Sequence, residues 1–142
     1  MSNSESITLK NYQLKLLVSW LDLPLHGKEA RARNRFLRIA AQRMDELEGE
    51  RIETLSELSE KDEKGSPKMN GNQYDLTPEN LKTFQDRMGV LNDEDFVIDV
   101  LPSNRQELKS VKEILDEEVG NRSFSVLEGR VYDEILTAFE KI

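Results

Sequence analysis

One long helical run, Lys28 to Glu63, constrains this chain more than any other segment, because its charge changes sign halfway. The first half carries six cations against one carboxylate, Glu29, whereas the second half, Asp45 to Glu63, carries nine carboxylates against Arg51 and Lys61. A helix dipole favours the opposite order by roughly a few tenths of a kcal/mol per charge. Local helix stability therefore does not select this pattern, which indicates charge complementarity with another surface.

The composition sets the size of the core and narrows the class of partner. The chain has 142 residues, 37% of them hydrophobic and 34% charged, which predicts one domain, or one domain with an appendage, around a modest core. A net charge of −8 argues against general binding to DNA or RNA backbones. It leaves open mimicry of nucleic acid or docking to a basic protein surface, and plain solubility is the alternative explanation of the charge.

The sequence shows no targeting or redox feature. There is no cysteine, so disulfides, thiolate chemistry and cysteine metal sites are excluded. The start, Met1 to Ser6, lacks the basic and apolar regions of a signal peptide. The longest apolar run is far shorter than the about 20 residues that a membrane-spanning helix needs. We therefore expect a cytoplasmic protein that does not bind membranes.

Hydrophobic periodicity predicts a fold that is mainly α with a minor two-stranded β element, of class α+β. Alternating residues favour strands at Ser6–Lys10 and Phe96–Val100, and we expect these two strands to pair. A leucine-rich helix over Tyr12–Leu23 is apolar on nearly all sides, so it is buried centrally or shared with another chain. After the break at Pro24–Gly27, the charged run is expected to pack antiparallel on this helix, which gives a helical hairpin followed by C-terminal helices.

The charged run is long for a domain of this size. At 1.5 Å per residue it would extend on the order of 50 Å. We therefore expect its acidic end either to project from the domain or to end before Glu63.

Capping residues predict three helices in the second half of the chain. Thr77 followed by Pro78 opens a helix that is expected to stop at Gly89. Capping boxes that begin at Ser103 and at Ser125 open two further helices.

Turn-forming residues concentrate between the two halves. They predict a flexible loop at residues 64–76, which is either irregular or the tip of a β-hairpin. This loop separates residues 1–63, with the N-terminal strand and helical hairpin, from residues 77–142, with the C-terminal helices and short strand. We expect the parts to form one compact domain overall.

The sequence contains no catalytic motif. His26 is the only histidine and lies in a helix break beside a glycine, so we expect no catalytic triad, no His–Cys dyad and no multi-histidine metal site to be built from it. The glycines are isolated, and no phosphate-binding GxGxxG or GxxxxGK pattern occurs. Asp93, Asp95 and Asp99 lack the glycine and spacing of an EF-hand loop, so a solvated surface is their ordinary interpretation and a divalent-ion site the alternative. We expect no enzymatic activity, no cofactor and no bound metal.

An arginine cluster is the main candidate binding site. Arg31, Arg35 and Arg38 stand at positions i, i+4 and i+7 and share a helix face, with Arg33 and Arg43 nearby. Guanidinium groups bind phosphate and carboxylate through two parallel hydrogen bonds. Three interpretations stay open: a solvated face with internal salt bridges, a docking surface for an acidic protein, or a pocket for an anionic nucleotide where subunits meet. A second candidate, an acidic docking face for a basic surface, consists of Glu46, Glu50, Glu53 and Glu57.

Two segments carry a resemblance to a known family. The leucine-rich helix leads into GKEARARNRF at residues 27–36, and the chain closes with VYDEILTAFE at residues 131–140. In these segments and in its order of elements, the chain resembles a family of small proteins of unknown function from tailed phages and prophages of Gram-positive bacteria. The resemblance implies a phage origin and an intracellular role during infection, such as inhibition of host machinery or defence, or accessory assembly. It implies no catalytic residues.

We therefore expect a non-enzymatic, phage-encoded interaction protein that binds a host or viral protein through charged helical surfaces. The first alternative is an oligomeric protein that sequesters an anionic nucleotide signal through the arginine cluster. The second alternative is a structural or assembly factor of the virion.

Overall fold

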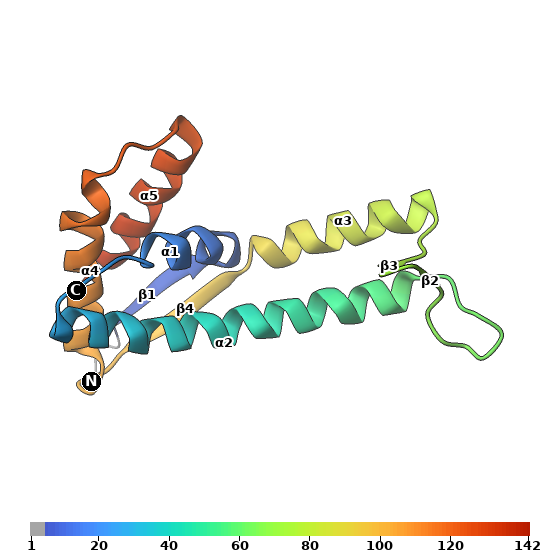
Figure 1. Ribbon diagram of the computed structural model, residues 1–142, viewed down its shortest axis with the longest axis horizontal. Coiled ribbons are helices and arrows are strands. Elements are labelled where there is room, and N and C mark those ends of the chain that lie inside the picture. The colour runs from blue at the N-terminus through green and yellow to red at the C-terminus, as the bar shows by residue number, and fades with distance from the viewer. Residues whose placement is uncertain (1–4) are drawn as a thin grey trace. The chain divides into compact units, whose positions relative to one another are not determined.

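The computed structural model describes residues 5–142 and has a mainly helical α+β fold (Figure 1). The described residues form five α-helices and two small two-stranded antiparallel sheets, and 63% of the chain is helical, which confirms the expected fold class. In chain order the elements are β1 Glu5–Lys10, a 3-10 turn Asn11–Gln13, α1 Leu14–Trp20, α2 Gly27–Leu58, β2 Met69–Asn70, β3 Gln73–Tyr74, α3 Pro78–Asn92, β4 Asp95–Val100, α4 Arg105–Glu117, a 3-10 turn Val119–Asn121, and α5 Val126–Phe139.

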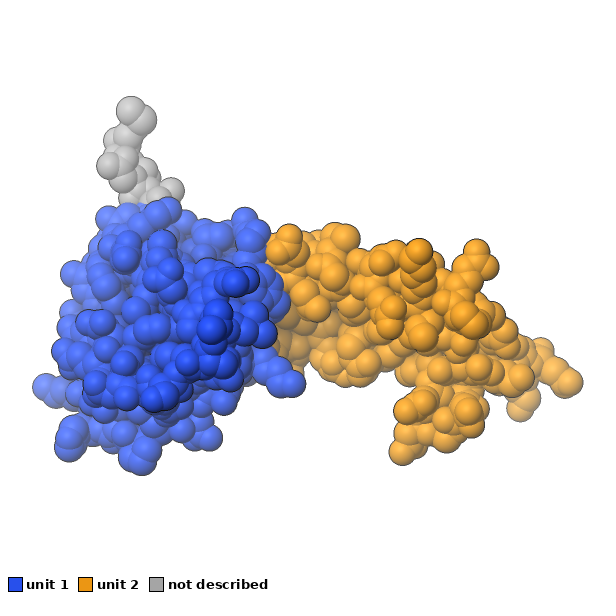
Figure 2. Space-filling view, turned by 90° about the horizontal axis from the view of Figure 1, so that it is seen from above, with its two compact units in different colours: residues 1–42, 95–142 blue, residues 43–94 orange. Residues whose placement is uncertain are grey.

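The chain forms two compact units, which Figure 2 colours separately. Unit 1 consists of residues 1–42 and 95–142, and unit 2 consists of residues 43–94. Helix α2 contributes its first half to unit 1 and its second half to unit 2. These bounds differ from the division that the sequence predicted at residues 64–76.

Unit 1 is built on the ladder between β1 and β4. The two strands pair antiparallel, with Glu5 opposite Val100 and Ile7 opposite Ile98, which confirms the predicted pairing. Alternate side chains point into the core, so that Ile7 and Leu9 of β1 and Ile98 and Val100 of β4 are all buried.

The helices of unit 1 supply the rest of this core. Their buried apolar residues recur at intervals of three and four, as in amphipathic helices with one face in the core. The buried side chains are Leu14, Leu17 and Trp20 of α1, Ala32, Phe36 and Ala40 of α2, Leu108, Val111, Ile114 and Leu115 of α4, and Val131, Ile135 and Phe139 of α5. Helix α1 is shorter than the predicted helix Tyr12–Leu23, because the chain first makes a 3-10 turn in which the Gln13 side chain accepts a hydrogen bond from the Lys10 amide, at 2.9 Å.

A cluster of three aromatic rings joins α1 to α5 and to the segment before it. The ring of Trp20 lies edge-on to Phe124 and Tyr132, at centroid distances of 5.3 and 5.9 Å, and Phe124 stacks on Tyr132 at 4.9 Å. The Tyr132 hydroxyl donates to the Leu115 carbonyl at 2.7 Å, and burial raises the pKa of this phenol. Gly120 leaves room for the hydroxyl, because a Cβ at this position would lie 2.7 Å from the Tyr132 oxygen.

Unit 2 contains an antiparallel helix pair, in which α3 lies beside the second half of α2 (Figure 1). The Asn80 side chain donates to the Leu58 carbonyl at 3.0 Å, and Arg87 pairs with Glu57 at 2.8 Å. The segment at residues 64–76 contains the short hairpin β2–β3, in which Gly71 takes a positive φ of 66° at the turn. The hairpin alternative of the sequence-based prediction is therefore present.

The N-terminal caps of α3 and α5 were predicted correctly, whereas that of α4 was not. The Thr77 side chain accepts from the Asn80 amide, and the Ser125 side chain accepts from the Glu128 amide. Ser103 does not cap α4. The capping position is Asn104, whose side chain accepts from the Leu101 amide and donates to the Asp99 carbonyl.

The end of α3 differs from its prediction, whereas the end of α2 matches one of the two predicted alternatives. Helix α3 continues through Gly89 to Asn92, because a glycine ends a helix only where the backbone turns left-handed and Gly89 has no positive φ. Helix α2 ends at Leu58, before Glu63, which is one of the two predicted alternatives, because side chains replace its next helical hydrogen bonds. The Ser56 carbonyl accepts from the side chains of Lys61 and Ser59, and the Leu58 carbonyl accepts from Asn80.

No helix within residues 5–142 is long and apolar enough to cross a membrane. The prediction about a signal peptide at Met1–Ser6 concerns residues that lie mostly outside this described range.

The packing around Tyr132 can be tested with a pair of glycine substitutions. We expect Gly120→Ala to lower the free energy of unfolding by about 1–3 kcal/mol, because the new methyl group displaces the phenol and leaves the Leu115 carbonyl unpaired. The matched control is Gly89→Ala, in the interior of α3, where a Cβ meets nothing within 4 Å. This control should raise the free energy of unfolding by about 0.5–1 kcal/mol. Chemical denaturation measures both, and a fully stable Gly120→Ala protein would contradict the role given to the hydroxyl.

Candidate functional site

The structure brings together three of the five arginines that the sequence singled out. Arg31, Arg35 and Arg38 line one depression on α2, with Asn34 between them and a volume of about 330 Å³. Arg35 forms an ion pair with Glu107 of α4. Within residues 5–142, neither Arg31 nor Arg38 forms an ion pair. The depression therefore offers two uncommitted guanidinium groups.

The other two arginines lie outside this depression. The Arg33 guanidinium donates to the carbonyls of Leu21 and Leu23, at 2.7 and 2.8 Å, and so holds the chain that leaves α1. Residues two apart on a helix point about 200° away from each other, which explains why Arg33 cannot join Arg31. Arg43 belongs to unit 2, where it pairs with Glu46 at 3.1 Å.

The structural role of Arg33 can be tested by comparing its substitution with that of Arg31, an exposed arginine two residues earlier on α2. We expect Arg33→Ala to lower the free energy of unfolding by about 1.5–3 kcal/mol, because two charge-assisted hydrogen bonds to main-chain carbonyls are lost. Arg31→Ala, on the opposite face, should change it by less than about 0.5 kcal/mol. Thermal or chemical denaturation of both proteins provides the measurement. Equal stability of the two variants would refute the assignment of Arg33.

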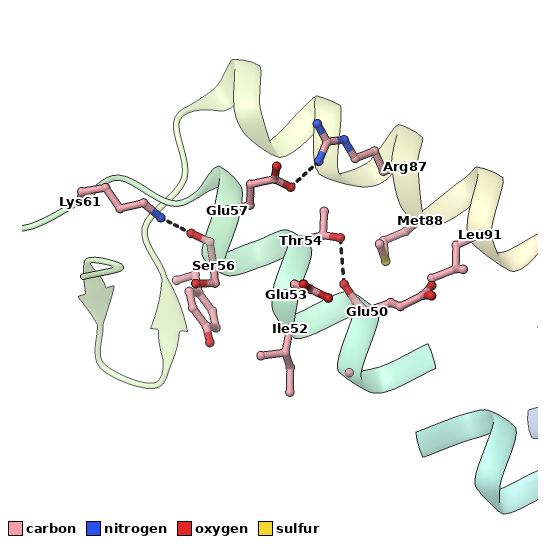
Figure 3. Close-up of a pocket in the computed structure, with 12 residues that line it drawn as sticks. Glu50, Ile52, Glu53, Thr54, Ser56, Glu57, Lys61, Arg87, Met88 and Leu91 are labelled. Atoms are coloured by element: carbon pink, nitrogen blue, oxygen red, sulfur yellow. Dashed lines mark hydrogen bonds and ion pairs between the residues drawn. The ribbon is translucent and has the colours of Figure 1, made fainter. Parts of the chain in front are cut away.

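The acidic face predicted on α2 lies in unit 2 and borders a pocket (Figure 3). This α2–α3 pocket has a volume of about 940 Å³ and opens to solvent between the two helices of the unit. Three of the four predicted glutamates line it, and Glu46 does not. The lining residues used below are Glu50, Ile52, Glu53, Glu57, Arg87, Met88 and Leu91.

The carboxylates of the pocket are only partly neutralised. Arg87 reaches from α3 to Glu57 of α2, as Figure 3 shows. In the described part of the chain, Glu50 and Glu53 have no ion-pair partner. Outside the pocket, a hydrogen bond from Arg51 lowers the pKa of Glu48 below its ordinary value. Glu50 and Glu53 therefore line the pocket without an ion pair, whereas Glu46, Glu48 and Glu57 of the same helix are paired.

Unit 2 has very little apolar core of its own. Of the twenty-one buried apolar side chains in residues 5–142, nineteen lie in unit 1, and unit 2 contributes only Leu55 and Leu91. Large apolar side chains of the unit remain accessible: Ile52 is 42% exposed, Leu81 43% and Val90 67%. The unit therefore exposes apolar surface that its own chain does not cover.

The net charge of the protein is concentrated in the same unit. Residues 43–94 contain fourteen Asp and Glu against seven Lys and Arg, which leaves −7 of the total charge of −8. Unit 1, with fourteen acidic and thirteen basic residues, is almost neutral.

Apart from Glu50, Glu53 and Glu57, the residues of the pocket were not among the predicted site residues. They include Ile52, Arg87, Met88 and Leu91. The signal that would have found them is the antiparallel pairing of α2 with α3, because the sequence pattern placed the partner of the charged run at Tyr12–Leu23 instead.

His26 is exposed, and within residues 5–142 no group of three or more His, Cys, Asp or Glu side chains is placed to hold a metal ion. Comparison of the chain with protein-family models, with curated proteins and with solved structures finds no significant match. Two surfaces remain as candidates, namely the arginine depression of unit 1 and the α2–α3 pocket of unit 2.

Proposed function

We propose that this protein is a non-enzymatic interaction protein whose acidic unit 2 binds a basic surface of another protein. The observation that carries the proposal is the coincidence, in one 52-residue unit, of a net charge of −7 with only two buried apolar side chains. Charge alone fits simple solubility, and exposed apolar side chains alone are common on protein surfaces. Together they favour an interface.

The small apolar core of unit 2 supports the proposal of a bound partner on energetic grounds. A fully buried aliphatic or aromatic side chain contributes about 1.5–3 kcal/mol, so Leu55 and Leu91 supply little against the cost of ordering the unit. A partner that covers Ile52 and Leu81 would add apolar burial to the unit, and any ligand that binds only the folded state stabilises that state.

The charge supports a basic partner rather than a second copy of unit 2. Two units of −7 repel each other, whereas a basic surface is attracted over about 8 Å at physiological ionic strength. The resemblance to phage proteins makes a host or viral protein the proposed class of partner. Inhibition of host machinery or of host defence is the outcome that we propose for such binding.

The proposal can be tested by capture from extracts of bacterial host cells with the immobilised full-length protein. We expect a basic protein to be retained at about 0.15 M salt and released towards 1 M, where the screening length falls to about 3 Å. Replacing all four glutamates of the acidic face by lysine should reduce this capture at least tenfold. These four glutamates are Glu46, Glu50, Glu53 and Glu57.

The control for this experiment reverses charge in unit 1 instead. Arg31→Glu with Arg38→Glu alters two arginines without an ion pair in the described chain, so the fold should persist and capture should be unchanged. Loss of the captured protein only in this control would show that the arginine depression docks an acidic partner, and would overturn the assignment to unit 2. Circular dichroism verifies that each variant is folded.

A second candidate function is sequestration of an anionic nucleotide, which the shared depression of Arg31, Arg35 and Arg38 favours. Native mass spectrometry of protein purified from infected cells should then show a small anionic molecule that heat releases. Arg31→Ala with Arg38→Ala should empty the site, and light scattering should show whether an oligomer forms. A ligand-free mass for the wild-type protein would reject this candidate.

A further inference from the structure

We propose that the free edge of β4 binds an extended, basic segment of another protein, which adds a third strand to the sheet of unit 1. Within residues 5–142 this sheet consists of β1 and β4 alone, so each strand pairs on one side and has an edge on the other (Figure 1). Such edges bind extended peptides through main-chain hydrogen bonds. The site belongs to unit 1 and does not depend on the function proposed for unit 2.

Two side-chain hydrogen bonds show which main-chain groups point away from the ladder. The Lys10 amide donates to the Gln13 side chain at 2.9 Å, so this amide does not face β4. The Asp99 carbonyl accepts from the Asn104 side chain, also at 2.9 Å, so this carbonyl does not face β1. In an antiparallel ladder, residue pairs that exchange hydrogen bonds alternate with pairs that do not. Both observations therefore define the same alternation.

The register of the ladder then identifies the open groups of β4. Three residue pairs do not exchange hydrogen bonds, because they are spaced two residues apart and include Lys10 and Asp99. These pairs are Lys10 with Asp95, Thr8 with Val97, and Ser6 with Asp99. The N–H and C=O groups of Asp95 and Val97 and the N–H of Asp99 consequently point to the free edge, where no other part of the described chain pairs with them.

The open edge of β4 is accessible to a ligand. Asp95, Val97 and Asp99 are all exposed, and the apolar side chain of Val97 has an exposed fraction of 52%. Their side chains alternate with buried Ile98 and therefore lie on the face of the sheet that is turned away from the core. Helix α5 lies against the other strand, β1, which favours β4 as the edge for a new strand.

The charges of β4 specify the ligand. The carboxylates of Asp95 and Asp99 flank Val97 on the exposed face. Lys10 pairs with Asp95 at 2.7 Å but leaves its side chain 53% exposed, and Asp99 forms no ion pair within residues 5–142. Opposite charges and β-branched side chains stabilise neighbouring strands when they lie opposite each other. The complementary segment therefore has basic, apolar and basic residues at alternate positions.

The same charges disfavour a second copy as the third strand. If two β4 strands paired antiparallel around Val97, the Asp95 of each copy would lie opposite the Asp99 of the other. Like charges in this position destabilise a ladder, and charged side chains on edge strands hinder pairing between copies. A basic segment reverses the sign of these contacts.

A peptide methylated on one side of its main chain provides the direct test. The probe is a fluorescein-labelled peptide with the order lysine, threonine, valine, threonine, lysine at its centre. When the valine lies opposite Val97, the lysine amides point to β4 and the threonine amides point away. We expect saturable binding to the full-length protein by fluorescence anisotropy. N-methylation of both lysine amides should weaken it about tenfold or more, and N-methylation of both threonine amides less than about twofold. Equal effects would overturn the proposal.

Two proline substitutions compare the two edges of the same ladder. Val97→Pro removes an N–H that points to the free edge of β4, and Thr8→Pro removes the corresponding N–H of β1, so neither removes a hydrogen bond of the ladder. We expect Val97→Pro to abolish probe binding and Thr8→Pro to change it less than about twofold. Circular dichroism verifies that both variants are folded, and equal binding by the folded variants would refute the site.

Hydrogen exchange gives a measurement that needs no variant. In the free protein, the amide of Val97 should exchange faster than that of Ile98, which donates across the ladder. Saturating probe should slow exchange at Val97 about tenfold or more and leave Thr8 unchanged. Slow exchange of Val97 in the free protein, or protection by the probe centred elsewhere, would contradict the assignment.

Charge variants test the chemistry of the ligand. Asp99→Lys should weaken probe binding about fivefold, because an attraction becomes a repulsion. Asp133→Lys, an equal change in charge at an exposed position of α5, should alter it less than about twofold. Loss of probe binding only in the fourfold glutamate variant would place the peptide on unit 2 and overturn the proposal. A dimer in light scattering that Val97→Pro dissociates would show that a second copy occupies the edge and that the proposed ligand is wrong.

Discussion

The antiparallel ladder between β1 and β4 is the interaction on which the rest of the structure depends. It places Ile7 opposite Ile98 and buries one face of both strands, so the chain must leave the sheet through α1 and α2 and return to it after α3. Unit 2 is therefore an insertion in the sequence of unit 1. The entropy cost of closing such a loop grows only with the logarithm of its length, which makes an insertion of 52 residues tolerable.

The division of apolar residues between the units follows from this constraint. Unit 1 holds nineteen of the twenty-one buried apolar side chains in residues 5–142, most of them in the ladder and the four helices around it, and unit 2 holds two. Unit 2 consequently relies on weaker interactions, such as the Thr77 cap, the Asn80–Leu58 hydrogen bond and the Glu57–Arg87 ion pair. An exposed ion pair contributes only about 0–1 kcal/mol. We expect unit 2 to be the part of the protein whose stability responds most to a bound partner.

Local patterns predicted the elements of this fold better than their ends and partners. The alternation in β1 and β4 and the hydroxyl at Thr77 act over a few residues, so the sequence revealed them. The end of a helix at Gly89 and the cap of α4 at Asn104 were mispredicted, because each depends on the backbone conformation reached in the fold. Spacing likewise showed that three arginines share a face, but it could not show that Glu107 of α4 pairs with Arg35.

The charges of α2 lie opposite to the order that the helix dipole favours, and the two halves of the helix differ in how the fold accommodates them. In the first half, Arg33 holds main-chain carbonyls beyond α1 and Arg35 pairs with a carboxylate of α4, and such charge-assisted contacts outweigh a dipole term of about 0.3–1 kcal/mol. Two of the cations in this half, Arg33 and Arg35, are thus explained within unit 1, whereas Arg31 and Arg38 form no ion pair in the described residues. In the second half, Glu57 has an internal cation, whereas Glu50 and Glu53 have none within the described residues. The carboxylates of unit 2 without an ion pair in the described residues therefore include Glu50 and Glu53, and the same unit exposes Ile52, Leu81 and Val90. A partner with both basic and apolar groups would pair such carboxylates and cover these side chains.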